Sequence, residues 1–281
     1  VNNEFYKIVV VNGTGMRSID KLPDGKYTYS ATYKGTDKIS RAIDSGVFEV
    51  KAVEYNVILN APDVKVIYHD GTRFIATLTD KQGNPIRDAA IEITINGKTY
   101  TKTTDEKGVV SLGLSLDSGI YTVTVNFKGL LNYTPITKQA NVTIEPTVKG
   151  LDVVKMFRNS TQYYAIFTDS QGNFLKNKNV QFNINGVFYT KTTNDKGIAM
   201  IGINLNPGKY IITAKNLVTG EQSSNIITVK SLIVQKDLTK YYLNASRFQT
   251  TIYNKDGSLA VNKEVTFNIN DVFYHRTTDS N

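Results

Sequence analysis

One long stretch recurs along this chain and constrains its fold more than any other feature. It reads QFNINGVFYTKTTNDKGIAMIGINLNPGKY from Gln181 to Tyr210 and EITINGKTYTKTTDEKGVVSLGLSLDSGIY from Glu92 to Tyr121. A shorter version, TFNINDVFYHRTTDSN, covers Thr266 to Asn281. Equivalent positions lie 89 residues apart in the first pair, since 181 minus 92 is 89, and 85 apart in the second, since 266 minus 181 is 85. Such a repeat is a small domain, longer than the roughly 20 to 50 residues of solenoid or propeller units.

Apolar residues alternate with polar ones in short runs within the repeat. This period of two, interrupted by turn residues such as Asn185-Gly186 and Asn206-Pro207-Gly208, is typical of half-buried strands and not of helices. With first and last strands at 153–158 and 225–230, a complete repeat has about seven strands. We therefore predict an all-β fold of tandem immunoglobulin-like β-sandwich domains. The alternating apolar residues are Tyr163, Ala165, Phe167, Val180, Phe182, Ile184, Ala199, Ile201, Ile203, Leu205, Tyr210, Ile212 and Ala214.

The repeat divides the chain into four parts. Complete immunoglobulin-like repeats are predicted at 55–148 and 149–231, between the C-terminal half of a domain at 1–54 and the N-terminal half of another at 232–281. The two halves nearly sum to one domain, but both contain the fourth strand of the repeat. We therefore favour an excerpt of a longer repeat protein over a subunit completed head to tail by its neighbour.

Charge and composition narrow the classes of partner. The chain has 33 Lys and Arg against 25 Asp and Glu, a net charge of +8, but the basic residues are scattered singly. We expect no nucleic-acid binding, and at most a long-range attraction to anionic envelope polymers. No apolar run approaches the roughly 18 residues of a membrane span, so any signal or anchor would lie outside this segment. Cysteine is absent, so no disulfide is expected.

Residues able to support catalysis or metal binding are few. His69 and His275 occupy non-equivalent repeat positions and lack the companions of a triad or metal site. The turns at 80–84, 169–173 and 194–197 each supply one or two carboxylates, whereas Ca²⁺ takes six to eight oxygen ligands. We expect no enzyme, no metal and no cofactor.

Three tyrosines open a strand directly after a turn that contains glycine. They are Tyr27, Tyr121 and Tyr210, and each occupies the place of a tyrosine-corner residue, whose hydroxyl binds the backbone upstream. A structural role is favoured over a binding role. Sequons for N-glycosylation occur at Asn12, Asn132, Asn141, Asn159 and Asn244. Asn159 and Asn244 are the better candidates because they share one repeat position.

The segments DSQGN, TKTTNDKGIA and NPGKYIITA, between Asp169 and Ala214, carry a family likeness. In this order they resemble the bacterial Ig-like repeats of invasin and intimin type adhesins. The Asn- and Tyr-rich composition is similar still more to adhesin-like surface proteins of methanogenic archaea. The resemblance implies an extracellular, cell-surface location and a stalk or adhesin whose partners are surface glycans, proteins or copies of itself.

The resemblance also implies a lysine–asparagine isopeptide cross-link as an alternative. Lys65, Lys155 and Lys240 recur within the first strand, and Asn141 and Asn225 recur near the last. The pairs would be Lys65 with Asn141 and Lys155 with Asn225. We find no acid that recurs convincingly beside them, and a lysine that extends from an edge strand into solvent explains the pattern without a bond.

Three functions follow as hypotheses. The preferred one is a non-enzymatic adhesin or stalk segment, in which short links such as 145–150 join compact modules and project a binding region. The second is a filament subunit assembled through the terminal half-domains. The third is a carbohydrate-binding module, with adjacent tyrosines at 163–164 and 241–242 as its aromatic surface.

Overall fold

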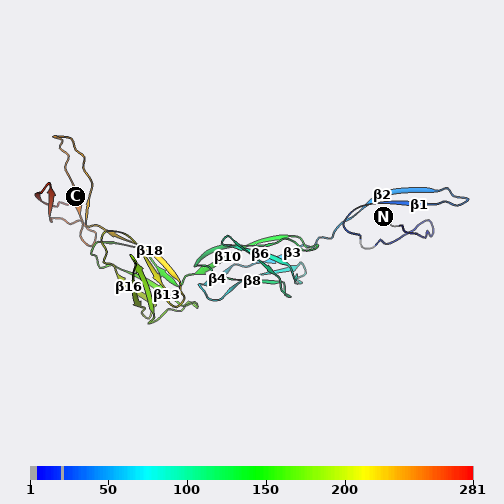
Figure 1. Ribbon diagram of the computed structural model, residues 1–281, viewed down its shortest axis with the longest axis horizontal. Coiled ribbons are helices and arrows are strands. Elements are labelled where there is room, and N and C mark those ends of the chain that lie inside the picture. The colour runs from blue at the N-terminus through cyan, green and yellow to red at the C-terminus, as the bar shows by residue number, and fades with distance from the viewer. Residues whose placement is uncertain (1–4, 20–21, 281) are drawn as a thin grey trace. The chain divides into compact units, whose positions relative to one another are not determined.

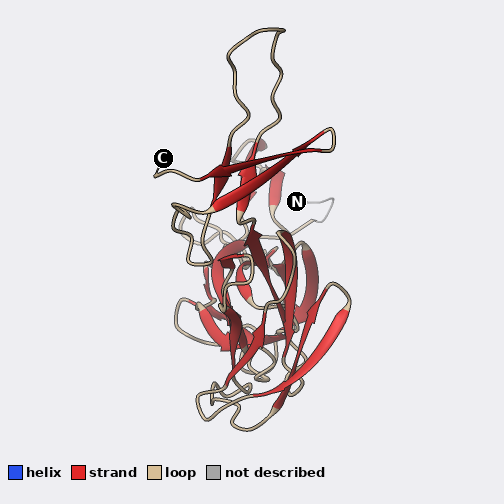
Figure 2. Cartoon of the chain, turned by 90° about the vertical axis from the view of Figure 1, so that its left-hand side faces the viewer, coloured by secondary structure: helices blue, strands red, loops and turns tan. Residues whose placement is uncertain are grey.

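The computed structural model describes residues 5–19 and 22–280, and every regular element in them is a β-strand (Figures 1 and 2). No helix long and apolar enough to cross a membrane occurs in these residues. The strands are β1 (Gly25–Tyr33), β2 (Ala42–Val50), β3 (Val57–Asn60), β4 (Val64–Ile67), β5 (Arg73–Asp80), β6 (Ala90–Ile95), β7 (Lys98–Thr103), β8 (Val109–Gly113), β9 (Gly119–Phe127), β10 (Ile136–Glu145), β11 (Val148–Gly150), β12 (Val153–Met156), β13 (Gln162–Phe167), β14 (Asn179–Ile184), β15 (Val187–Thr192), β16 (Ile198–Gly202), β17 (Gly208–Lys215), β18 (Gln222–Lys230), β19 (Ile233–Gln235), β20 (Thr250–Ile252), β21 (Glu264–Ile269) and β22 (Val272–Thr277).

The second repeat, β11 to β18, forms two sheets. One has the order β12-β18-β17-β14-β15 and the other the order β11-β13-β16. Alternate side chains of both sheets are buried in one core that runs from Val148 to Val229 in the sequence. The predicted all-β immunoglobulin-like fold is thereby confirmed. Buried and exposed side chains alternate along these strands, as in a sandwich in which each sheet has one buried face.

Three aromatic rings occupy the centre of this core. Phe182, Tyr163 and Phe167 are all fully buried. The ring of Phe182 meets that of Tyr163 edge-on, with centroids 5.7 Å apart and planes at 90°, and that of Phe167 at 6.0 Å and 65°. Such edge-to-face pairs add about 0.5–1.5 kcal/mol beyond the burial of apolar area.

The first strand of the repeat is divided between the two sheets. A single strand was expected at 153–158, whereas β11 pairs with β13 in one sheet and β12 runs parallel to β18 in the other. Asp152 lies at the crossing, and its Oδ1 accepts a hydrogen bond of 2.8 Å from the amide of Ile226 on β18. The carboxylate therefore satisfies a backbone donor at the place where regular pairing begins.

The first repeat, β3 to β10, has the same sheet orders, β4-β10-β9-β6-β7 and β3-β5-β8. Here Asp63 Oδ1 accepts a hydrogen bond of 2.7 Å from the amide of Asn141. Asp63 and Asp152 are 89 positions apart, and Asp237 follows 85 further on. The expectation that no acid recurs beside the repeated lysines was therefore wrong. In both complete repeats this aspartate accepts from a backbone amide of the last strand, and Asp152 also accepts from the side chain of Asn225.

The two terminal segments form hairpins with little burial. Residues 25–50 contain β1 and β2, paired from Gly25 opposite Val50 to Tyr33 opposite Ala42, and none of their side chains is buried. Residues 232–280, all of which the structure describes, contain β19 to β22, and Ala260 alone is buried there. Residues 5–9, the sequence equivalents of β15, form no strand.

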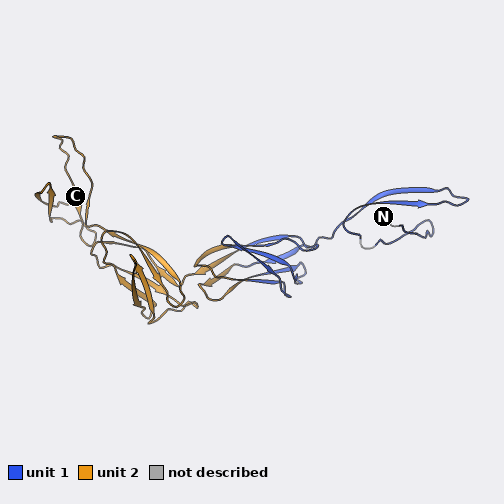
Figure 3. Ribbon diagram, viewed as in Figure 1, with its two compact units in different colours: residues 1–62, 75–111, 123–139 blue, residues 63–74, 112–122, 140–281 orange. Residues whose placement is uncertain are grey.

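The backbone contacts group the chain into two compact units, which Figure 3 colours separately. The first comprises residues 1–62, 75–111 and 123–139, and the second comprises 63–74, 112–122 and 140–281. The second unit therefore contains every strand of the second repeat, together with the link that precedes it.

Candidate functional site

Buried polar side chains of the second unit gather around Thr147, in the link before β11. Thr147, Asn216 and Glu221 are each at most 4% exposed. Glu221 Oε2 accepts hydrogen bonds from the amide of Thr147 at 2.5 Å and from its hydroxyl at 2.6 Å. Asn216 Nδ2 donates to the carbonyls of Thr168 at 2.8 Å and of Thr147 at 3.4 Å. The link is thereby built into the second repeat, and we call these three residues the link clamp.

The turn between β17 and β18 positions the link clamp. Asn216 Oδ1 accepts from the amide of Val218 at 3.0 Å, which closes a local Asx-type turn. The hydroxyls of Thr219 and Thr147 lie 2.8 Å apart. Gly220 supplies the left-handed backbone, with φ of 83°, that brings Glu221 back toward the link. Glu221 Oε1 is buried without a hydrogen-bond partner, so the clamp has one unused acceptor.

In the acidic turns, each aspartate carboxylate accepts hydrogen bonds from groups of its own turn. Asp169 Oδ1 accepts from the amides of Gln171 at 2.9 Å and Asn173 at 2.8 Å, and its Oδ2 accepts from Asn173 Nδ2 at 3.1 Å. Asp80 makes the same set of bonds, and the hydrogen bond from the Asn84 side chain, with those from backbone amides, holds the pKa of Asp80 below its ordinary value. Ordinary turns account for these residues. No group of three His, Cys, Asp or Glu in the described ranges could hold a metal ion.

The two histidines have separate partners. His69 stacks on Tyr68 with ring centroids 4.0 Å apart, and it adopts a left-handed backbone with φ of 57°. His275 Nδ1 lies 3.0 Å from Glu264 Oε1 on the exposed β21–β22 hairpin. His275 Nδ1 also lies 3.2 Å from the hydroxyl oxygen of Thr266. The hydroxyl and the carboxylate thus contact the same ring nitrogen, whereas a catalytic histidine contacts its nucleophile and its orienting acid through different nitrogens.

The side chains of Lys155 and Asn225, the proposed cross-link pair, make their hydrogen bonds to different residues. Lys155 is 5% exposed, and its Nζ donates to the carbonyls of Asn159 at 2.5 Å, Ile203 at 2.8 Å and Thr161 at 3.3 Å. Burial lowers the pKa of this amine. All three protons of the ammonium thus find backbone acceptors, which is why a lysine is tolerated in the interior.

Asn225 belongs to a second network, which runs from the buried Tyr163 to the exposed Asp152. Its Oδ1 accepts from the hydroxyl of Tyr163 at 2.7 Å, and its Nδ2 donates to Asp152 Oδ1 at 3.3 Å. Burial, with the nearby Asp152 charge, raises the pKa of Tyr163 to about 12. In the first repeat, the exposed Lys65 instead pairs with the half-buried Glu145, whose Oε1 lies 3.1 Å from Lys65 Nζ.

These partners do not favour an isopeptide bond in either repeat. We expect the intact mass of the purified chain to equal the mass of the sequence, because the Lys155 amine faces carbonyl oxygens and Lys65 makes an ion pair. Each cross-link would remove one ammonia. A mass lower by one or two ammonia molecules would restore the cross-link hypothesis.

The three predicted corner tyrosines make the same hydrogen bond. The hydroxyls of Tyr27, Tyr121 and Tyr210 donate to the carbonyls of the residues four positions earlier, at 2.7, 2.8 and 2.9 Å. A tyrosine corner holds the chain in this way where it enters a strand. Their acceptors are Pro23, Asp117 and Asn206.

The sequon asparagines differ in exposure. Asn12, Asn132, Asn141 and Asn244 are exposed, and Asn159 is half-buried. Asn159 Oδ1 accepts from both the amide and the hydroxyl of Thr161, at 2.8 and 2.5 Å. Asn244 is therefore more accessible than its repeat equivalent Asn159, a difference that the shared sequence position gave no means to predict.

The aromatic pairs proposed as a carbohydrate surface also differ. Tyr163 is fully buried in the core, whereas its neighbour Tyr164 is 48% exposed, as expected for adjacent residues of one strand. Tyr241 and Tyr242 lie outside the strands, and both are more than 80% exposed.

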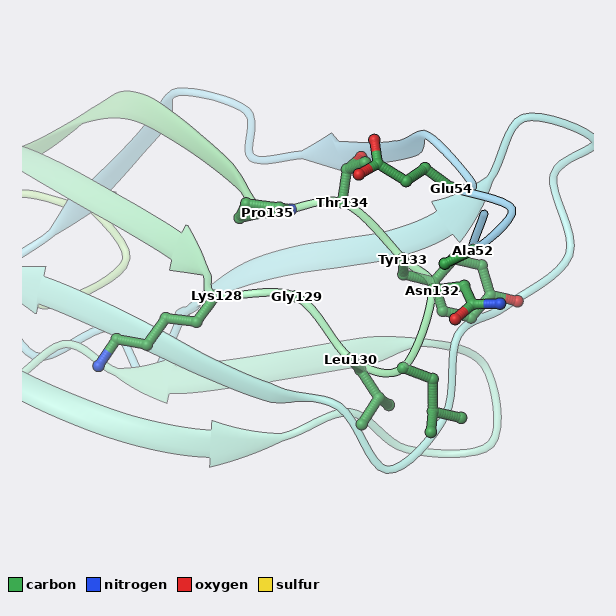
Figure 4. A pocket seen from close by; sticks show the side chains of 10 residues that line it. Ala52, Glu54, Lys128, Gly129, Leu130, Asn132, Tyr133, Thr134 and Pro135 are labelled. Atoms are coloured by element: carbon green, nitrogen blue, oxygen red, sulfur yellow. The ribbon is translucent and has the colours of Figure 1, made fainter. Parts of the chain in front are cut away.

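An open hollow lies in the first unit beside the loop 128–135, which joins β9 to β10 (Figure 4). Tyr55 donates its amide to the carbonyl of Asn132 at 2.7 Å and so fixes one side of the loop. Leu131 is 94% exposed with φ of 53°. Lys128 and Glu54 lie at opposite ends of the hollow in Figure 4, so its charged groups do not converge on one point.

The comparisons with known proteins concern fold. No protein-family model matches the chain, and no curated protein matches it. Among solved structures, it resembles a Ca²⁺-stabilized adhesin with which an Antarctic bacterium binds ice, at 17% identity over 91% of this chain and 71% of that one, with a TM-score of 0.27. A 1.5-MDa bacterial ice-binding adhesin matches at 13% identity over 74% of each chain, with a TM-score of 0.28.

The fibronectin(III)-like modules of Clostridium thermocellum CbhA match at 16% identity over 62% of this chain and 94% of that one, with a TM-score of 0.23. At such identities and TM-scores these likenesses support no conclusion about this chain beyond the fold that its own strands show. The likeness to archaeal surface proteins and to invasin or intimin stays a prediction from the sequence.

Proposed function

We propose that this chain is a non-enzymatic segment of a cell-surface adhesin or stalk, in which sandwich modules act as spacers for a binding region. The observation that carries the proposal is the link clamp. Only Pro146 and Thr147 stand between β10 and β11, and Thr147 is 1% exposed and held by Glu221 and Asn216. A link fixed to one module leaves few backbone torsions free, and that restricts bending.

The location and partners belong to the same proposal. A stalk works outside the cell, so we place the segment at the cell surface, with surface glycans or proteins as partners of the region that it carries. The exposed sequons, Asn244 above all, are compatible with glycosylation, which adds bulk and solubility at surface positions. Antibodies against the purified chain should label intact cells.

Removal of the link clamp should increase bending between the repeats. The chain has no cysteine, so spin labels can be attached at Lys107→Cys and Lys196→Cys, two exposed turn positions in the two complete repeats. We expect a narrow distribution of label-to-label distances in this background. Glu221→Ala should broaden the distribution, because it leaves the buried amide of Thr147 without its acceptor and removes the hydrogen bond from the Thr147 hydroxyl to the carboxylate.

Glu221→Gln is the matched control, because its amide oxygen still accepts from Thr147. It should keep the narrow distribution. A distribution that is already broad in the unaltered background would count against a stalk. So would small-angle scattering that indicates one collapsed globule of the size expected for this chain length.

A further inference from the structure

Near its entry and its exit, the second repeat runs through two neighbouring parallel strands. Strand β12 pairs with β18, with Val153 opposite Ile227 and Met156 opposite Lys230. The amide of Phe157 donates to the carbonyl of Lys230 at 2.9 Å and extends the pair by one bond. Only two residues separate β18 from β19, so the chain leaves the repeat at the carboxyl end of this pair.

The parallel direction decides how a pull along the chain loads these strands. The pull reaches β12 from its amino end and β18 from its carboxyl end, and the two forces are opposed. In a parallel pair these points lie at opposite ends of the pair, so the strands must slide past each other before they separate. Their hydrogen bonds, which run between the strands, are then strained together and not one after another.

The first repeat has the same strand pair. Its β4 pairs parallel with β10, from Val64 opposite Val142 to Ile67 opposite Glu145. The amide of Tyr68 donates to the carbonyl of Glu145 at 3.0 Å, as that of Phe157 does to Lys230. The arrangement therefore belongs to the repeat and not to one copy of it.

In the second repeat a buried lysine fastens β12 within this pair. Lys155 lies opposite Val229, and its Nζ donates to three backbone carbonyls. One of them belongs to Ile203, which lies in the connection from β16 to β17. Sliding β12 along β18 pulls the ammonium away from these acceptors, and burial keeps water from replacing them.

The equivalent lysine of the first repeat is fastened differently. Lys65 pairs with Glu145 on β10, but its side chain is 72% exposed. An ion pair so open to water contributes little, because solvent screens it and replaces either partner. The two repeats thus share the strand pair, and in the second the fastening group is out of reach of water.

We propose that the β12–β18 pair bears tension along the chain in shear, and that Lys155 holds β12 in place against it. This load-bearing role rests on the stalk function proposed above, because a stalk transmits the pull that acts on the region it carries. Antibody labelling of intact cells tests the stalk function, whereas force measurements on the purified chain test the load-bearing role, so either can fail alone.

Pulling the second repeat in two directions tests the shear. The chain has no cysteine, so handles can be attached to pairs of introduced cysteines. Leu151→Cys with Lys230→Cys places them at opposite ends of the β12–β18 pair, and the strands must slide. Ser160→Cys with Lys230→Cys places them at the same end, and the pair opens bond by bond. All three residues are exposed.

In single-molecule stretching at one speed, the handles at 151 and 230 should require a higher unfolding force than those at 160 and 230. Equal forces in the two directions would overturn the proposal. This comparison uses the unaltered Lys155, so it does not depend on whether a variant at that position folds.

Replacing Lys155 tests its part in the resistance. With handles at 151 and 230, Lys155→Met should raise the unfolding rate at constant force by about tenfold or more, because hydrogen bonds from a charged donor are lost. Lys209→Met, at an exposed position of β17, is the matched control and should leave the rate unchanged. An unchanged rate in Lys155→Met, or equal acceleration by both substitutions, would show that Lys155 does not hold β12.

Discussion

Replacing Phe182 with alanine will lower the free energy of unfolding of the second repeat by about 3–5 kcal/mol. The ring is fully buried and meets both Tyr163 and Phe167, so its removal loses apolar burial and leaves a cavity between rigid aromatic neighbours. In calorimetry of the whole chain, the transition of the second repeat should fall by more than about 10 °C. That of the first repeat should stay in place, because the core of the second repeat begins at Val148.

The control for this variant is Phe188→Ala on the neighbouring strand. Phe188 lies opposite Asn183 and is 64% exposed, so its ring contributes little to the core. The change in unfolding free energy should stay within about 0.5 kcal/mol. Equal effects of the two substitutions would show that the inward and outward faces of β14 and β15 have been assigned incorrectly.

Local sequence patterns were enough to predict most of the fold. The alternation at 163–167 and at 180–184 predicted which side chains point inward, because successive residues of a strand face opposite sides and one face must leave water. The turn at Asn185-Gly186 was equally predictable from the sequence. Both of its residues have positive φ, 53° and 76°, which asparagine and glycine adopt more readily than other residues.

Contacts between distant residues were not predictable in this way. Thr147 and Glu221 are 74 positions apart, and the pair has no counterpart in the other repeats that spacing could reveal. The cage of three carbonyls around Lys155 likewise depends on how strands far apart in sequence come together. One signal was available and missed, namely the aspartate at 63, 152 and 237, which marks the division of the first strand.

Glycine at position 197 is expected to be as critical to the second repeat as its aromatic core. Its φ is +68°, and a Cβ built there lies 2.5 Å from the carbonyl oxygen of Phe167. Gly108, its equivalent in the first repeat, has φ of +71° and the same close approach to the carbonyl of Leu78, at 2.4 Å. Gly197→Ala should therefore destabilise the second repeat by about 2–5 kcal/mol, through a strained backbone and a collision with a strand that cannot move away.

Two other glycines separate these two causes. Gly186 has φ of +76° and open space around its Cβ position, so Gly186→Ala should show the backbone cost alone, about 1–2 kcal/mol. Gly202 has open space and no left-handed φ, so Gly202→Ala should be close to neutral. In chemical denaturation, Gly197→Ala should lose the most unfolding free energy, Gly186→Ala less, and Gly202→Ala the least. If Gly197→Ala lost no more than Gly186→Ala, the close approach to Phe167 would contribute nothing, and backbone conformation alone would explain the glycine.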